Sequence, residues 1–539
     1  MGTLWYNGTF FTMNKEGEAA EAVYVENGAI QAIGEKERLE QQYKDHITAK
    51  KDVGGAYVYP GFVDSHLHLI GHGERLLRLD LSEVESAAEM KQLLQEKALE
   101  SKGEEWLFAE GWNENNFSDR KIFHRSELDE IAPGKPMYLS RICRHAALVN
   151  SEALKRAGIS SATPDPPGGV IVRDLQGEPT GYLLDTATEL IKQVIPPVTE
   201  EYIRKALTTA VDDLVKVGLV GGHTEDLFYY GGFLRTFKQF RDVIDGKRRK
   251  FRAHLLIHHE ALAEMEAAGI NEREVSPFLE LGAVKIFVDG ALGGRTALLI
   301  DPYTDDPSTS GVAIHPEEEL LKLVKLARSK GRPVALHTIG DRALALSLAA
   351  IETYPLAAGN GRDRLIHVQV VQDELIEQMK RLPVVLDIQP RFVVSDFPWV
   401  MERLGHDRLP HSFAWKSLLE RGLHCAGGSD APIEPVDPLL GIHAAVTRRK
   451  AGESHEGYLP EQKLSVFEAV TLFTGGSAYA INKENERGKI APGFTADFTV
   501  LDTNLFTCEP DRIVSAKVVM TVVDDTVMYS SSEDHDAAS

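Results

Sequence analysis

Two histidines separated by a single residue, His66 and His68, lie where a hydrophobic run ends in the segment YPGFVDSHLHLI. Side chains two residues apart on a β-strand point to the same face of the sheet, so both imidazoles can reach one metal ion. Imidazole nitrogen is a common ligand of zinc and of other divalent transition metals. Two hydrogen-bonded core histidines would have the same spacing, so the pair by itself leaves both interpretations open.

Four further polar residues lie within or directly after hydrophobic runs. They are Lys285 in VKIFVDG, His337 in PVALH, His367 in RLIH and Asp430 in CAGGSD. In a parallel β/α barrel the carboxyl ends of all strands lie at one end, where the loops collect functional groups. Core packing alone would not place six such side chains at the same end of different strands. The pattern therefore predicts a metal centre.

The elements that must position these residues alternate between two patterns. Short β-branched runs such as GAVKIFVDG and RPVALHTIG are separated by segments such as PEEELLKLVKLARSKG, whose hydrophobic residues recur at helical spacing. Strands and helices in alternation predict a parallel sheet. About eight such strands in one long segment favour a closed barrel over an open sheet. The predicted fold class is α/β, with a (β/α)8 TIM barrel over residues 58–485.

Four other segments do not follow this alternation. Residues 1–57 contain two Asn-Gly pairs, which favour tight hairpin turns, and residues 486–530 contain β-branched runs broken by Pro-Gly or acidic turns. We expect both termini to form one small β-sandwich domain. Residues of about 75–200 are predicted to be an insertion after the first barrel strand, and residues 531–539 a flexible polar tail.

The composition disfavours several kinds of partner. The chain has 81 acidic and 59 basic side chains, a net charge of −22, which would repel nucleic acid and anionic membranes. Its start lacks the basic and hydrophobic regions of an export signal, and no hydrophobic stretch approaches the roughly 18 residues of a membrane helix. Three cysteines, Cys143, Cys425 and Cys508, show no paired spacing. We expect a cytoplasmic protein that acts on a small molecule, with a homodimer left open.

The order HxH, strand lysine, His, His, Asp resembles that of the amidohydrolase superfamily. The segments PGFVDSHLHL, VKIFVDGALGGRTA, LHTIGDRA, GGSDAP and GKIAPGFTADFTVLD are similar to the amidohydrolase 3 subgroup, or YtcJ-like metal-dependent hydrolases. That subgroup includes an N-substituted formamide deformylase. The similarity covers nearly the full length, and it is more specific for the superfamily than for the subgroup.

The resemblance implies two divalent metal ions, for which zinc best suits mixed imidazole and carboxylate ligands. The ligands it implies are His66, His68 and Asp430 for the first ion, His337 and His367 for the second, and Lys285 between them. The lysine would bridge the ions as a carbamate formed with CO₂, because an ammonium group cannot bind a cation. A surface or ion-paired lysine is the alternative.

The resemblance also implies hydrolysis of a C–N amide bond other than a peptide bond (EC 3.5 class), by a hydroxide that bridges the two ions. Asp430 would take the proton from the hydroxide and pass it to the leaving nitrogen. Alternatives are a single-metal deaminase, a lactone or ester hydrolase, and a non-catalytic scaffold. Deaminases of this superfamily carry a glutamate three residues after the fifth-strand histidine, where this chain has Gly340, which disfavours deamination.

Six weaker candidates for substrate binding are Trp112, Asn113, His145, His223, Asp289 and Arg295. His145 resembles a histidine that the subgroup places near the pocket. Structural alternatives are a buried ring for Trp112, a position behind the metal ligands for His223, and a loop-stabilising ion pair for Arg295.

Other polar residues near strand ends have supporting roles in this interpretation. Gln389, Pro390 and Arg391 end a further run and could contact substrate, whereas Asp341 and Arg342 would support His337. The doublet His258-His259 is expected to point to opposite faces of a strand, so it is not predicted to chelate a metal.

Overall fold

The computed structural model describes residues 2–100, 106–141 and 146–532. The chain divides into two compact units, Met1–Gly71 with Ile203–Ser539, and His72–Tyr202. The predicted tail, residues 531–539, lies outside the described residues except for its first two positions. In the described part of the chain, no helix combines the length and the hydrophobicity needed to cross a membrane.

The first unit contains a nearly closed barrel of eight parallel strands, which confirms the predicted TIM barrel. In chain order they are β6 (Phe62–Leu67), β13 (Leu219–Thr224), β14 (Arg252–His258), β16 (Leu279–Phe287), β17 (Val334–Thr338), β18 (Asp363–His367), β19 (Val384–Ile388) and β20 (Cys425–Gly427). The short β15 (Glu274–Ser276) pairs antiparallel with β16. Two backbone hydrogen bonds join the first and last strands at their carboxyl ends: Asp430 N donates to His66 O at 2.7 Å, and His68 N donates to Ala431 O at 2.8 Å.

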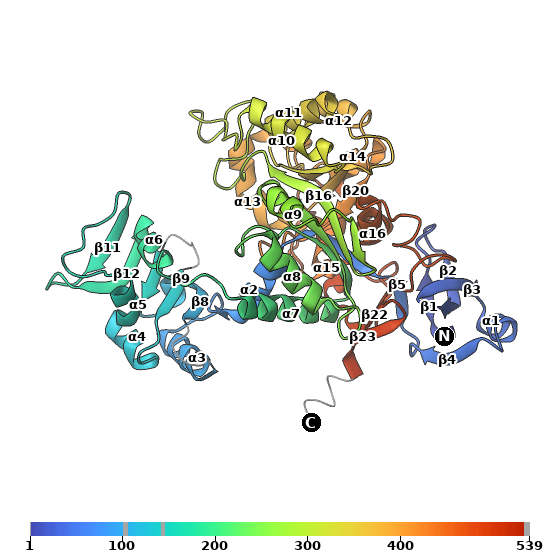
Figure 1. The fold of residues 1–539 in the computed structure, drawn as a ribbon, viewed down its shortest axis with the longest axis horizontal. Helices are drawn as coiled ribbons and strands as arrows, with labels where there is room; N and C mark the ends of the chain where they lie inside the picture. The colour runs from blue at the N-terminus through green and yellow to red at the C-terminus, as the bar shows by residue number, and fades with distance from the viewer. Residues whose placement is uncertain (1, 101–105, 142–145, 533–539) are drawn as a thin grey trace. The chain divides into compact units, whose positions relative to one another are not determined.

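Helices follow the strands and cover the barrel; in Figure 1, α10, α11 and α12 lie along its outer side. The main ones are α7 (Glu200–Lys216), α8 (Phe233–Val243), α9 (Leu262–Ala267), α10 (Glu317–Ser329), α11 (Asp341–Thr353), α12 (Asp373–Met379), α13 (Phe392–Leu404), α14 (Trp415–Glu420), α15 (Pro438–Thr447) and α16 (Val466–Thr471). The helix α10 shows why these segments are helical. It buries Leu320, Val324 and Ala327, which lie on one face at helical spacing. Its first turn holds three glutamates, whose negative charges interact favourably with the positive end of the helix dipole.

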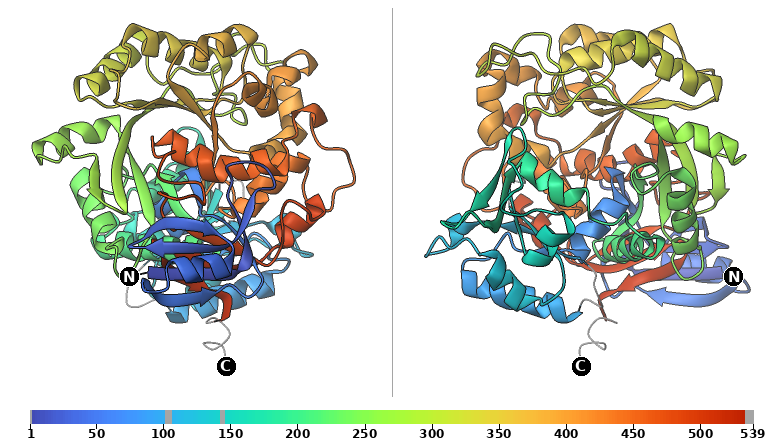
Figure 2. Two further views of the ribbon diagram at one scale, coloured as in Figure 1. Left: turned by 90° about the vertical axis from the view of Figure 1, so that its right-hand side faces the viewer. Right: turned by 60° about the vertical axis from the view of Figure 1, so that its left-hand side comes forward.

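The two termini share one eight-stranded sheet, in the order β23-β22-β21-β5-β1-β2-β3, with β4 paired to β1. Its strands are β1 (Gly2–Phe11), β2 (Ala19–Glu26), β3 (Ala29–Gly34), β4 (Ile47–Asp52), β5 (Tyr57–Pro60), β21 (Phe498–Leu501), β22 (Val518–Val523) and β23 (Thr526–Ser530). Figure 2 shows the blue amino-terminal and red carboxyl-terminal strands side by side, where β5 pairs with β21. The division of this sheet into the two layers of a sandwich stays a prediction.

The two Asn-Gly pairs behave differently. Asn27 and Gly28, with φ of 53° and 77°, form the two-residue turn between β2 and β3, as predicted. The hairpin predicted at Asn7 is wrong: β1 continues through it, with a register shift against β2 between Tyr6 and Phe10 and a φ of 61° at Asn7. An Asn-Gly pair accommodates a bulge as readily as a turn, because both need positive φ.

The second unit, His72–Tyr202, follows β6 in sequence and precedes β13. Its six-stranded sheet has the order β11-β12-β10-β9-β8-β7. Its elements include β7 (Leu79–Asp80), α3 (Ala87–Glu100), β8 (Leu107–Trp112), α4 (Arg125–Ile131), β9 (Met137–Arg141), β10 (Ala146–Val149), α5 (Ser151–Arg156), β11 (Gly169–Arg173) and β12 (Pro179–Asp185). A separate hydrophobic core, with Trp112 and Leu139 among its members, holds it together.

Candidate metal centre

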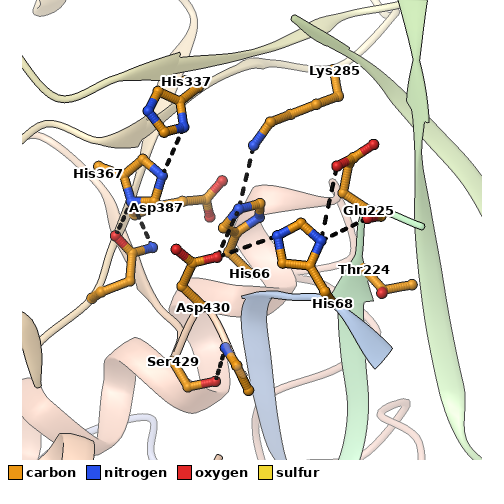
Figure 3. Close-up of polar contacts among 12 residues, drawn as sticks. His66, His68, Thr224, Glu225, Lys285, His337, His367, Asp387, Ser429 and Asp430 are labelled. Atoms are coloured by element: carbon orange, nitrogen blue, oxygen red, sulfur yellow. Dashed lines mark hydrogen bonds and ion pairs between the residues drawn. The ribbon is translucent and has the colours of Figure 1, made fainter. Parts of the chain in front are cut away.

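The six predicted ligands come together at the carboxyl ends of the barrel strands (Figure 3). The shortest separations between their nitrogen and oxygen atoms are His66 Nε2 to Asp430 Oδ1, 3.6 Å; His68 Nε2 to Asp430 Oδ1, 3.5 Å; Lys285 Nζ to His66 Nε2, 3.3 Å; and His337 Nδ1 to His367 Nε2, 3.1 Å. Two ligands of a tetrahedral zinc ion at bond lengths of about 2.0–2.1 Å are about 3.3 Å apart. The three distances that join histidine and aspartate atoms therefore match the spacing of ligand atoms around metal ions. Lys285 Nζ would carry the carbamate, whose oxygens would be the ligand atoms.

Hydrogen bonds hold three of the four imidazoles with one nitrogen directed into this cluster. His68 Nδ1 donates to the carbonyl of Glu225 at 2.8 Å, and His337 Nε2 donates to the carbonyl of Gly290 at 3.2 Å. His367 Nδ1 donates to Gln389 Oε1 at 2.7 Å. Each bond places the proton on the outer nitrogen, so the inner nitrogen keeps its lone pair for a metal. The corresponding outer nitrogen of His66 has no hydrogen-bond partner among the described residues.

Burial keeps most of these imidazoles neutral, which is the form that binds metals. Burial, with help from the charge of Lys285, lowers the pKa of His337 to about 3 and lowers those of His66 and His367 well below the usual value. For His68 burial also acts to lower the pKa, but the hydrogen bond and charge of Asp430 outweigh it and raise that pKa to about 9. A divalent ion would replace this proton as the partner of Asp430.

Lys285 has the environment that carbamate formation needs. It lies on β16, is 1% exposed, and burial lowers the pKa of its ammonium group to about 8, although nearby carboxylates act to raise it. Its Nζ lies 4.7 Å from the centre of the Phe287 ring. A neutral amine is the form that reacts with CO₂, and its fraction becomes substantial near pH 8.

The backbone around Asp430 is built to hold the carboxylate in place. Asp430 has a φ of 57° and His367 one of 78°, both in the left-handed region, which costs about 1–3 kcal/mol per residue and is common at functional sites. The buried carboxylate of Asp64 accepts hydrogen bonds from the backbone N–H groups of His66 and Ser429, both at 3.0 Å. A Cβ at Gly428 would lie 2.6 Å from His66 N, so only glycine fits there. These contacts bring the first and last strands into register.

Sequence reasoning missed a seventh group at this site, the carboxylate of Glu225. It is 0% exposed, accepts a hydrogen bond from Tyr229 OH at 2.8 Å, and has its Oε2 3.9 Å from His68 Nδ1. Its Oε1 has no hydrogen-bond partner among the described residues, and burial raises the pKa of this carboxyl to about 7. The signal was present in LVGGHTED, because residues 223 and 225 share a face and 225 lies nearer the carboxyl end of the barrel.

Three of the candidates for substrate binding lie in the second unit or outside the described residues. Trp112 is fully buried in the core of that unit and donates its indole N–H to Leu139 O at 2.9 Å, which contradicts the prediction that it stacks on substrate. Asn113 caps a short 3₁₀ helix by accepting the N–H of Asn115 at 3.1 Å, and its contact with substrate stays a prediction. His145 lies outside the described residues.

The remaining three candidates lie in the first unit. His223 does not reach the metal cluster, since its ring packs 5.2 Å from that of His254 and its Nδ1 accepts a hydrogen bond from Arg364 at 3.2 Å. Asp289 is buried and accepts three backbone N–H groups, so it anchors the loop after β16. Arg295 forms a two-pronged ion pair with Asp305. His223 and Asp289 are thus buried in structural roles, whereas Arg295 has the ion pair that was its structural alternative and its contact with substrate stays a prediction.

Two supporting roles also change. Asp341 accepts the N–H of Ile300 and the amide of Gln372, both outside the metal cluster, instead of supporting His337. Arg391 pairs with Glu434 at 2.6 Å.

The histidine doublet was interpreted incorrectly. β14 ends at His258 and a 3₁₀ turn begins at His259, so strand alternation no longer applies and the two rings stack at 4.5 Å with an angle of 27°. With Glu260 they offer ligand atoms within 4.8 Å of one another.

A parallel barrel with this cluster at the carboxyl ends of its strands defines the class of metal-dependent hydrolases. A model of the amidohydrolase family matches residues 51–529, and the chain belongs to that family. It is 50% identical over 534 residues to a protein of Bacillus subtilis (strain 168) provisionally named amidohydrolase YtcJ, covering 99% of this chain and 100% of that protein.

Two more distant relatives also match over nearly their whole length. The N-substituted formamide deformylase of Arthrobacter pascens is 27% identical, with 97% of each chain covered. The crystal structure of an uncharacterized metal-dependent hydrolase from Pyrococcus horikoshii OT3 superposes with a TM-score of 0.79 at 29% identity, covering 95% of this chain and 99% of that one. The resemblance drawn from the motifs is confirmed.

Proposed function

We propose that this protein hydrolyses a C–N amide bond other than a peptide bond (EC 3.5 class), with two zinc ions at the cluster. The observation that carries the proposal is the convergence of six side chains at one end of the barrel. Nitrogen and oxygen atoms of His66, His68, Lys285 and Asp430 approach to 3.3–3.6 Å, those of His337 and His367 to 3.1 Å, and the rings of His66 and His367 lie 5.6 Å apart. Similarity to an N-substituted formamide deformylase supports an amide as the bond that is cleaved.

The residues fit a pair of divalent ions. His66, His68 and Asp430 would hold the first ion and His337 and His367 the second. Lys285, as a carbamate, would supply carboxylate oxygens to the ions. Its burial and the lowered pKa of its ammonium group agree with this role. When bound, the ions lower the pKa of a water molecule and polarise a carbonyl oxygen.

Asp430 has the position of the group that moves the proton. Its Oδ1 lies beside both first-strand histidines, and its backbone N–H bond to His66 O holds it at the cluster. In the proposed reaction it accepts the proton of the attacking water and delivers it to the leaving nitrogen, so that an amine and a carboxylic acid are released.

The structure disfavours the deaminase alternative at one position. A Cβ at Gly340 would lie 2.0 Å from the carbonyl oxygen of Leu298. This position therefore has no room for the glutamate that the superfamily's deaminases carry there.

The test combines metal analysis with turnover. Protein purified without chelators should contain about two zinc ions per chain, and it should hydrolyse some members of a panel of N-substituted formamides, N-acyl amino acids and cyclic amides. Asp430→Asn should lower kcat by about 10²–10⁴-fold, the usual contribution of general acid–base catalysis. The matched control is Asp511→Asn, whose carboxylate pairs with His443 and Arg449 instead of the cluster. An Asp430→Asn variant with a near-normal rate would refute the proton-transfer role.

A further inference from the structure

A cavity of about 520 Å³ opens at the amino ends of the barrel strands, opposite the end that carries the metal cluster. Its walls come from the first residues of β16 and from the segments just before β17, β18 and β19, with residues 480–483 closing one side. Lys285, His337 and His367 lie at the other ends of the same strands. Nothing in the proposed hydrolysis uses this cavity.

Positively charged side chains predominate in its lining. The cations are Arg273, Arg362, Arg364 and Lys483, and the carboxylates are Glu274 and Glu280. Most of these charges have an opposite partner, in the pairs Arg362–Glu484, Arg364–Asp387, Lys483–Glu486 and Arg487–Glu280. Arg273 is the exception among the lining cations that the structure describes.

Within the described residues, two neighbouring guanidinium groups have only carbonyl oxygens as partners. Arg273 donates to Asn360 O at 3.1 Å and to Gly331 O. Arg332, which is 3% exposed, donates to the carbonyls of Leu281 and Gly282 at 2.9 and 3.1 Å. Neither forms an ion pair with a carboxylate in the described ranges. Burial and the charge of Arg273 together lower the pKa of Arg332 to about 10, which indicates positive charge without a counter-charge.

Arg364, a further cavity-lining residue, is 1% exposed, and its Nη1 has no hydrogen-bond partner among the described residues. Its other nitrogens are used: Nε donates to Asp387 at 2.7 Å and Nη2 to Ser65 O at 2.6 Å. Ser65 precedes a metal ligand on β6, and Arg364 shares β18 with His367. An unpartnered donor of a buried guanidinium is costly unless a ligand or water accepts from it.

We propose that this cavity binds a small anion through a carboxylate or phosphate group. Arg273 supplies the uncompensated charge, and Arg362 and Lys483, which also line the cavity, supply further N–H donors. Guanidinium groups suit both ligands, because their fork of N–H donors matches paired oxygens. In a chain with a net charge of −22, an anion is attracted here only because the local charge is reversed.

The test is calorimetric titration of the zinc-loaded full-length protein with inorganic phosphate and, separately, with malonate, at constant ionic strength. The metal cluster can also take oxyanions, so the informative quantity is the binding that depends on Arg273. Arg273→Gln should weaken that binding at least tenfold, and Arg273→Glu should abolish it. Arg273 is exposed, so both variants are expected to fold, and circular dichroism and zinc content verify this.

The control is Arg38→Gln, an exposed arginine of α1 (Lys36–Gln42), which should bind the anion as the wild type does. Hydrolysis by Arg273→Gln without added anion should equal that of the wild type, which separates this proposal from the proposed catalysis. Preference for phosphate or for malonate identifies the anion class. The proposal is overturned if the Arg273 variants and the wild type bind both probes equally. It is also overturned if the wild type shows no binding at probe concentrations of about 10 mM.

Discussion

The hydrogen bond between Gln389 and His367 offers a sharp test of how this site is held for metal. Gln389 is 1% exposed and accepts the Nδ1–H of His367, itself 2% exposed, at 2.7 Å. In Gln389→Leu the imidazole loses this acceptor. It must then either leave a buried donor unsatisfied, at a cost of about 1–3 kcal/mol, or move its proton to Nε2, the nitrogen that faces the cluster.

Either outcome weakens metal binding by a similar amount. Removing such a supporting partner typically costs 10–100-fold in metal affinity, which is about 1.4–2.7 kcal/mol and agrees with the cost of the lost hydrogen bond. We therefore expect Gln389→Leu to raise the Kd of the more weakly bound zinc ion by about 10–100-fold. Activity should recover when excess zinc is supplied, because the ligands themselves are unchanged.

Competition with a zinc-binding fluorescent chelator measures both dissociation constants. Gln372→Leu is the matched control, since it also removes one glutamine hydrogen bond, to Asp341 at 2.8 Å, but touches no proposed ligand. Circular dichroism checks the fold of each variant. If the zinc dissociation constants of Gln389→Leu lie within about twofold of those of the control, the Gln389 amide does not hold the imidazole and the reasoning fails.

Three further predictions concern charge, pH and core packing. Arg364→Met leaves the buried carboxylate of Asp387 unpaired, so urea denaturation should show that the free energy of unfolding falls by about 3–5 kcal/mol. The double variant with Asp387→Leu should recover most of this loss, and losses that simply add in the double variant would count against the pair. Because the pKa of Lys285 is lowered to about 8, the neutral amine increases as pH rises, and labelling of the metal-free protein with ¹³CO₂ should be stronger at about pH 8.5 than at about pH 6.5 at equal dissolved CO₂, with no signal in Lys285→Met. Trp112→Ala should destabilise its unit by about 3–5 kcal/mol in thermal unfolding without changing zinc stoichiometry, whereas a substrate-stacking role would change KM with little loss of stability.

The barrel and the convergence of the six candidate ligands could be predicted because both depend on local patterns. Each barrel strand is a short hydrophobic run, and a polar residue near its carboxyl end reaches the same end of the barrel whichever neighbours it has. His66 and His68 needed only strand alternation to converge, and Asp430 needed only to follow the last strand. The two Asn-Gly pairs show the limit of such reasoning, since one forms the predicted turn and the other lies within β1.

Assignments that depend on a partner elsewhere in the chain were less reliable. Arg295 was a candidate for binding a substrate carboxylate, but two of its N–H groups, at Nε and Nη2, donate to Asp305. Trp112 was a candidate for stacking on substrate, but it lies in the hydrophobic core of the second unit. Glu225 was passed over in favour of His223, because sequence does not show at which depth in the barrel a side chain meets the others.

By itself the sequence determined which side chains could bind metal and on which strands they lie. Strand periodicity is a local property of the sequence, and all strands of a parallel barrel end on the same side whatever their neighbours are. Only the tertiary structure decided which nitrogen of each imidazole faces the cluster, since that depends on acceptors such as the Glu225 carbonyl and the Gln389 amide from other strands. The tertiary structure also decided that neither Arg273 nor Arg332 forms an ion pair with a carboxylate of the described residues, because ion pairing depends on distances between segments far apart in the chain.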